Sequence, residues 1–285
     1  MFRRNTAIKT SHEVLFLIIM ATTALGASPA AGDSTREQVV EMVVQIQRAD
    51  YEGNRSALKL LHEEMAPFAG NKELAARVQY WRGFALWRRA INGFNEKVEL
   101  AELKDDMEHA LDEFDDAIRK DSVFVDAKIG ALSCLGFLAF SDRTQDMSSP
   151  RIQELILRGR QLRKDIEAVA PENPRFLWVM GPMIWYSPPE RGGGQDKAIA
   201  AYEKGLQTIR SQKEVVSDPL EPSWGEPELL MSLAWSNLNR TTPDLGAAKQ
   251  EADSALKLVP YWHYVHDILV PQIRDAKTNQ RLHLF

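Results

Sequence analysis

The sequence predicts an all-α protein: an α-solenoid of about four to five antiparallel helix pairs, with one further helix capping its C-terminal end. Three observations support this prediction. After residue 32, apolar residues recur at three- and four-residue spacing, which is typical of amphipathic helices. Proline and glycine fall mostly between these segments. Small and aromatic residues also recur in the same order and at the same spacing along the chain, so we expect successive helix pairs to pack in the same way.

The first segment, residues 1–26, has the layout of a signal peptide. MFRRNTAIKTSHE is basic, VLFLIIMATTALG is apolar, and small residues follow in ALGASPAAG. The apolar run is short for a bilayer span, which needs about 20 residues. We therefore expect Sec-type export, cleavage near Gly26 or Ala30, and a periplasmic or secreted protein without a stable membrane span. The alternative is an uncleaved N-terminal anchor helix.

The folded domain is expected to span residues 33–274. Residues 35–66 would form a diverged leading pair, and a helix from about Trp262 would cap the stack. A polar tail would follow at 275–285. An acidic, lysine-dotted stretch around 95–106 would be an insertion between the two helices of the next pair, and the sequence leaves open whether it covers the groove described below.

The helices between these ends share one pattern. The second helix of a pair carries small and aromatic residues in the order Ala110-Phe114-Ala117, Ala198-Tyr202-Gly205 and Ala248-Ala252-Ala255. The first helix carries a small residue one turn ahead of an apolar one, as at Gly83, Gly181 and Ser232. Small residues at these spacings let one helix lie close to its neighbour, and the ring is expected to fill the gap between pairs. The segment LILRGRQLRKDIEAV matches poorly. It has Gly159 and Arg163 at the positions where a small residue and a ring are expected.

This pattern resembles the tetratricopeptide repeat (TPR) over about residues 70–260. The stretches YSPPERGGGQDKA and PYWHYVHDILVPQI resemble more closely the exported bacterial TPR proteins of unassigned function. The periplasmic TPR subunit of TRAP transporters is distantly similar; it is typically lipid-anchored, whereas here no cysteine stands directly after the signal segment, where a lipid would be attached. The resemblance implies that the first helix of each pair lines a concave surface, which solenoid proteins use for binding.

Mapping this surface onto the chain gives a set of candidate partner-binding residues rich in rings and arginines. They are Arg77, Tyr80, Phe84, Trp87, Arg88, Arg175, Trp178, Trp185 and Tyr186. Trp, Tyr and Arg dominate protein recognition, and arginine pairs well with carboxylates. We therefore expect exposed rings to bury apolar side chains of a protein or peptide partner, while arginines fix its orientation. The alternative is that these rings belong to the core, because Trp and Tyr are highly buried on average.

The three glycines Gly192 to Gly194 precede the helical stretch QDKAIAAYEKGLQ, as a phosphate-binding loop would. Such a loop follows a buried strand and, in the Walker type, ends in Gly-Lys-Ser/Thr. Here a helix precedes the glycines and Gln195-Asp196 follows them. The glycines are therefore predicted to form the turn between two helices, with anion binding at the helix N-terminus as the alternative.

Catalytic and metal-binding patterns are sparse. His263-x-x-His266 places two imidazoles on one helical face with His283 as a possible third, but zinc needs three or four ligands, so a surface histidine pair is the expectation. The chain has no G-x-S-x-G elbow and no H-E-x-x-H motif. The only cysteine, Cys134, lies in an apolar stretch and is expected to be a buried thiol. We expect no catalytic residue, no metal and no cofactor.

The net charge of −5 disfavours nucleic acid and anionic membranes as partners, because both require a basic footprint. The expected function is an exported, non-enzymatic scaffold that binds a protein or peptide in an aromatic-lined groove. The alternative is a periplasmic transport accessory that holds a small apolar or anionic ligand.

Overall fold

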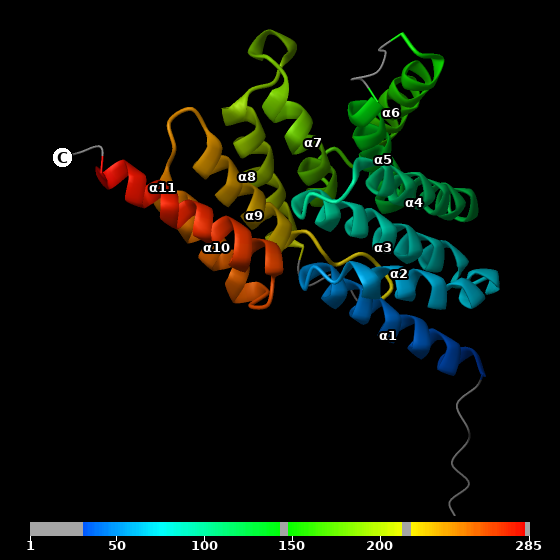
Figure 1. The fold of residues 1–285 in the computed structure, drawn as a ribbon. Coiled ribbons are helices and arrows are strands. Elements are labelled where there is room, and N and C mark those ends of the chain that lie inside the picture. Colours follow the sequence, from blue (N-terminus) through cyan, green and yellow to red (C-terminus); the bar gives the residue numbers. More distant parts are fainter. Residues whose placement is uncertain (1–30, 143–147, 213–217, 283–285) are drawn as a thin grey trace, which may run out of the picture.

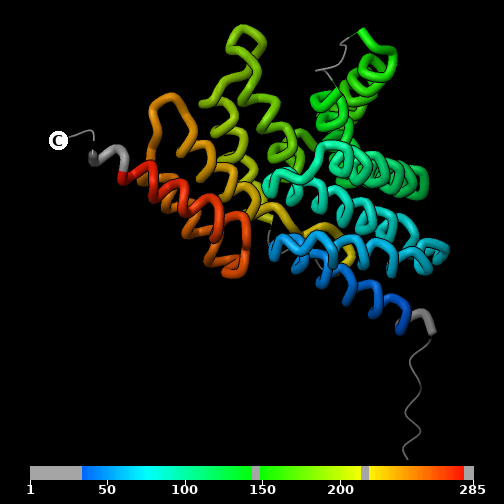
Figure 2. Tube along the Cα trace, viewed as in Figure 1, coloured from blue at the N-terminus to red at the C-terminus, as the bar shows by residue number. Residues whose placement is uncertain are grey.

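The computed structural model describes residues 31–142, 148–212 and 218–282 (Figures 1 and 2). Within these ranges the chain forms eleven α-helices and no strand. The predicted all-α class is therefore confirmed. No helix in the described ranges combines the length and the apolar character needed to cross a bilayer.

The helices pack mainly against their neighbours in the sequence. They are α1 (Ala31–Tyr51), α2 (Arg55–Glu64), α3 (Ala75–Asn95), α4 (Leu100–Lys120), α5 (Val125–Asp142), α6 (Pro150–Val169), α7 (Pro174–Tyr186), α8 (Gln195–Ser211), α9 (Glu226–Asn239), α10 (Leu245–Leu258) and α11 (Val270–Leu282). Short 3₁₀ turns, η1 (Ala66–Gly70) and η2 (Pro189–Arg191), follow α2 and α7, and a π-helical stretch, η3 (Tyr264–Leu269), leads into α11. The pairs α3/α4, α7/α8 and α9/α10 make extensive contacts.

Helices α3, α5, α7 and α9 also contact one another in chain order, since α3 packs on α5, α5 on α7 and α7 on α9. They form an inner layer, and α4, α6, α8 and α10 lie outside it (Figure 1). Helix α6, the predicted poor match, packs on α5 and stands apart from α8 at the edge of the molecule (Figure 1). Its face toward α5 buries only Ile152 and Ile166 completely.

The recurring small and aromatic residues meet between the helices of a pair. A Cβ atom added at Gly181 in α7 would lie 2.1 Å from the ring of Tyr202 in α8. At Gly83 in α3 it would lie 3.0 Å from the ring of Phe114 in α4. Both rings are buried and occupy the space that the missing side chains leave. The helices of both pairs thus lie close together at a small residue, and the ring lies within the pair as well.

This contact gives a first testable prediction. Gly181→Ala forces the buried Tyr202 ring out of place, and overpacking of this kind costs about 1–3 kcal/mol. Gly136→Ala in α5 is the matched control, because a Cβ there meets no atom within 4 Å. It should stabilise by about 0.5–1 kcal/mol, since alanine is the better helix former. Urea unfolding measures both, and equal effects of the two changes would contradict the packing described.

Two segments that the sequence assigned to an insertion and to a polar tail are largely helical in the described residues. Most of the 95–106 stretch is helical, because α4 begins at Leu100, and Leu103 and Met107 are buried. This stretch therefore lengthens α4 and is not a separate insertion. The predicted polar tail continues α11 as far as Leu282.

The glycine-rich turn is confirmed between α7 and α8. Gly192 and Gly194 have positive φ angles of 82° and 115°, which glycine adopts without steric cost.

Candidate functional site

The rings predicted to be exposed on the inner layer are mostly buried. Tyr80, Phe84 and Trp87 in α3 are at most 1% exposed, and Trp185 in α7 is 9% exposed. The expectation that these four rings face solvent in an open groove is therefore wrong. Trp178 is half-buried, and only Tyr186 is strongly exposed, at 76%.

The physical reason is a segment between α8 and α9 that lies across the inner layer. We call residues 218–225 the strap (Figure 1, the yellow segment that leads into α9). The strap has no helix or strand of its own, yet Leu220 and Trp224 are 1% and 4% exposed. Both side chains join the core formed with α1, α3, α4 and α5. The groove predicted for a partner is therefore filled by the chain itself.

Trp224 is the centre of this contact. Its Nε1–H donates a 2.8 Å hydrogen bond to the hydroxyl of Tyr80. Its ring centroid lies 5.6 Å from those of Phe84 and Trp87 and 5.5 Å from that of Trp178, with tilted or edge-on planes. Such geometries are favourable for aromatic pairs. Four predicted groove residues thus surround one tryptophan of the strap.

Arginines hold the rest of the strap. Arg77 in α3 donates a 2.7 Å hydrogen bond to Glu221 and also pairs with Asp121. Arg36 in α1 pairs with Asp218 at 2.6 Å. Burial alone would raise the pKa of the Asp218 carboxyl, but the Leu220 N–H and Arg36 outweigh it and lower that pKa.

Backbone carbonyls of the strap are also bound. The indole N–H of Trp81 donates to the Leu220 carbonyl at 2.9 Å, and Arg175 donates to the Trp224 carbonyl at 3.2 Å while pairing with Asp126. The strap then turns into α9 at Gly225, whose φ of 131° favours glycine. A Cβ there would lie 3.1 Å from Ile209. The strap is thus fixed by α1, α3 and α7, far from α9 in sequence.

The remaining predicted arginine, Arg88, belongs to a buried polar network beside the strap. Arg88 is 2% exposed, and its Nε donates to Asp50 at 2.7 Å. Asn92 also donates to Asp50, at 3.2 Å. Next to this pair, the Tyr51 hydroxyl donates to Glu228 at 2.9 Å. The network joins α1, α3 and α9, so it connects the N-terminal helices to the pair α9/α10.

Glu228 gives the network a pH dependence. Burial raises the pKa of its carboxyl, the nearby Asp50 charge raises it further, and Arg88 opposes both. Because the folded-state pKa lies above the unfolded value, Glu228 stabilises the fold increasingly as pH falls through the folded pKa. Between about pH 7 and about pH 5, wild type should therefore gain stability relative to Glu228→Gln. Urea unfolding across this range measures the difference, with Glu64→Gln on the exposed end of α2 as the chemical control. A constant difference would contradict the assignment.

The last predicted residues lie in α7. Trp178 donates from Nε1 to the Ser232 hydroxyl at 2.9 Å, and Trp185 packs edge-on against Trp235 with centroids 5.2 Å apart. Both therefore connect α7 to α9. Tyr186, at the end of α7, has its ring in solvent. Among the predicted partner-binding residues, Tyr186 is therefore the one whose side chain is exposed to solvent in the structure.

The histidine pair is organised around one carboxylate. His263 and His266 each place Nδ1 against Asp267, at 2.8 and 2.6 Å. No group of three or more His, Cys, Asp or Glu residues in the described ranges is placed to hold a metal ion. His283 lies outside those ranges. Cys134 is fully buried, and burial raises the pKa of its thiol well above the usual value, which keeps it protonated.

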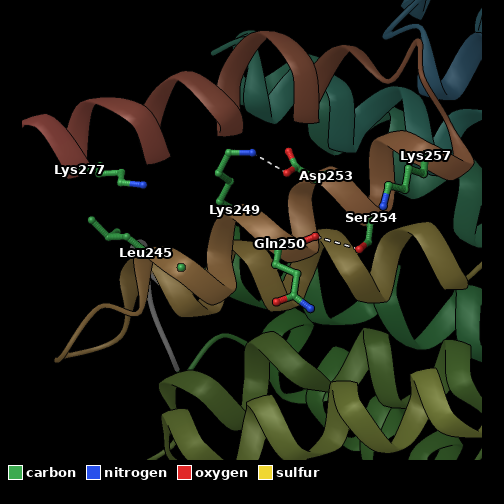
Figure 3. A pocket seen from close by; sticks show the side chains of 8 residues that line it. Leu245, Lys249, Gln250, Asp253, Ser254, Lys257 and Lys277 are labelled. Carbon is green, nitrogen blue, oxygen red and sulfur yellow. Dashed lines mark hydrogen bonds and ion pairs between the residues drawn. The ribbon is translucent and has the colours of Figure 1, made fainter.

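A shallow groove of about 330 Å³ lies between α10 and α11 (Figure 3). Lys249 and Lys257 reach it from α10, and Lys277 faces them from α11. Lys249 pairs with Asp253 on its own helix at 2.5 Å. The groove is open and carries more positive than negative side chains, in a chain whose overall charge is −5.

Sequence reasoning missed Leu220, Trp224, Trp81, Asp50 and Glu228. One signal was available for the strap, since DPLEPSW places an aliphatic and an aromatic residue among prolines in a long connection. Long connections without regular structure are commonly functional.

The described residues define an all-α chain of packed helix pairs whose inner layer binds a segment of the same chain. No protein-family model matches the sequence, and comparisons with curated proteins and with solved structures also gave no match.

Proposed function

We propose that the protein is an exported TPR-type scaffold that recognises a protein or peptide partner without catalysis. One observation carries this proposal: Arg77, Tyr80, Phe84, Trp87, Arg175 and Trp178 converge on an extended segment of chain and hold its side chains and backbone. Aromatic anchors with arginine contacts at their edge are the chemistry of a peptide-recognition surface. The occupant in the described form is the strap.

Further support comes from the exposed ring at the edge of this surface. Tyr186 follows directly after Trp185, whose ring is packed against α9, so its backbone position is fixed while its side chain is free to make contacts. Rigid, partly apolar side chains of this kind suit protein interfaces. Export is proposed from the residues 1–26 pattern alone.

Site-specific photo-crosslinking in the cell envelope of the native host tests this proposal. A photoreactive amino acid at position 186 should give a discrete adduct with one protein. The matched control is position 157 on α6, where Leu157 is 62% exposed. The same adducts from both positions, or none from position 186, would contradict a partner at this surface.

The alternative, a transport accessory for a small anion, is favoured by the lysine-lined groove between α10 and α11. Native mass spectrometry of protein purified from its host separates the two proposals. A retained small anion that is lost in Lys249→Gln/Lys277→Gln supports the accessory, whereas a bare chain supports the scaffold.

A further inference from the structure

We propose that the strap is an internal ligand, and that the inner-layer groove takes a partner segment of the same chemistry. That chemistry is an aliphatic residue followed directly by an acid and, four residues after the aliphatic one, by a tryptophan, as in Leu220, Glu221 and Trp224. This inference rests on the proposed function and names the kind of partner it requires.

The first argument is the nature of the contacts. The strap is held by side chains of helices that belong to three different pairs: Arg36 in α1, Arg77 and Trp81 in α3, and Arg175 in α7. These side chains bind its two acids and two of its carbonyls. A peptide bound from outside would need the same contacts, because an extended segment cannot satisfy its own backbone groups.

The second argument is the gradient of exposure along the strap. Its anchors, Leu220 and Trp224, are buried, but both ion pairs lie at the surface: the Asp218 side chain is 41% exposed and that of Glu221 is 37% exposed. Exposed ion pairs contribute little to stability, since water screens them. A competing segment could therefore replace the charged contacts first and the apolar anchors afterwards.

The third argument is specificity. Trp224 Nε1–H finds an acceptor in the buried Tyr80 hydroxyl, so a phenylalanine anchor would leave that hydroxyl without this bond. The guanidinium of Arg77 lies 3.9 Å from the centroid of the Phe124 ring while it binds Glu221, which fixes the position of the acid. The groove should therefore prefer tryptophan over phenylalanine and an acid over a neutral residue.

Fluorescence anisotropy tests the inference with a labelled synthetic peptide of residues 218–225 as the probe. Wild type, whose groove is occupied, should bind it weakly. Asp218→Asn/Glu221→Gln loosens the strap without touching the core and should bind at least about threefold more tightly. Trp224→Ala empties the anchor pocket and should bind at least about tenfold more tightly. Leu157→Ala, which shortens an exposed side chain on α6, is the control protein and should behave as wild type.

A second peptide, in which alanine replaces the tryptophan, should bind none of these proteins. The inference is overturned if the folded Asp218→Asn/Glu221→Gln variant binds the tryptophan peptide no more tightly than wild type does, or if both peptides bind equally. Should Trp224→Ala fail to fold, the surface variant decides the outcome alone. The result is independent of the crosslinking assay, so a scaffold that binds its partner elsewhere would fail here and succeed there.

Discussion

Trp224→Ala is expected to destabilise the protein by about 3–5 kcal/mol, the usual cost of emptying a buried tryptophan site. The side chain is 4% exposed and touches rings from α3 and α7, so its loss leaves a cavity between two parts of the inner layer. The change also removes the hydrogen bond to the buried Tyr80 hydroxyl. Urea or thermal unfolding measures the effect.

The matched control for this prediction is Tyr186→Ala. It removes a ring that is 76% exposed and should change the free energy of unfolding by less than about 0.5 kcal/mol. Trp224→Phe should lie between the two, because it keeps most of the apolar volume and loses the N–H donor. If Trp224→Ala were as mild as Tyr186→Ala, the strap would not be part of the core.

Arg88→Met should destabilise by a similar amount, about 3–5 kcal/mol, for an electrostatic reason. Asp50 is 1% exposed, and within the described ranges Arg88 is the cation that pairs with it, at 2.7 Å. Without the guanidinium, a buried carboxylate is left with Asn92 alone, so the fold must carry an unpaired charge or take up a proton. Equilibrium unfolding at neutral pH measures the cost.

The double change Asp50→Asn/Arg88→Met tests the cause directly. It removes both charges, so it should recover most of the stability lost in the single variant. Arg48→Met is the surface control, because Arg48 pairs with Glu52 in solvent and its loss should leave the free energy of unfolding nearly unchanged. A double variant as unstable as Arg88→Met would show that lost packing, and not the unpaired carboxylate, causes the damage.

The helix pairs could be predicted from the sequence because local pattern determines them. Small residues such as Gly181 predicted close helix packing by their type and spacing, and the structure places the Tyr202 ring over this glycine. The lengths of α4 and α11 could not be predicted as well. Charged side chains between 95 and 106 and beyond 275 look like loop or tail, although they continue helices whose other faces are packed.

The sequence did not reveal that a segment of the same chain covers the predicted groove residues. Aromatic residues and arginines of α3 and α7 do hold an extended segment, but side-chain type does not reveal which segment it is. The position of the strap depends on contacts with helices that are distant in the sequence. The spacing of apolar residues carries no information about such contacts. Asp50 and Glu228 were missed for the same reason, since a carboxylate that pairs inside the fold looks like a surface charge in the sequence.

The central claim is that the strap fills the groove of the inner layer in the folded protein. The indole N–H groups of Trp81 and Trp224 report it directly, because one donates to the strap and the other comes from it. Amide and indole hydrogen exchange followed by NMR should show both indole protons protected to nearly the same degree as the interior of α3. Exchange of both at the rate of a free indole, in a protein whose α3 amides stay protected, would contradict the claim.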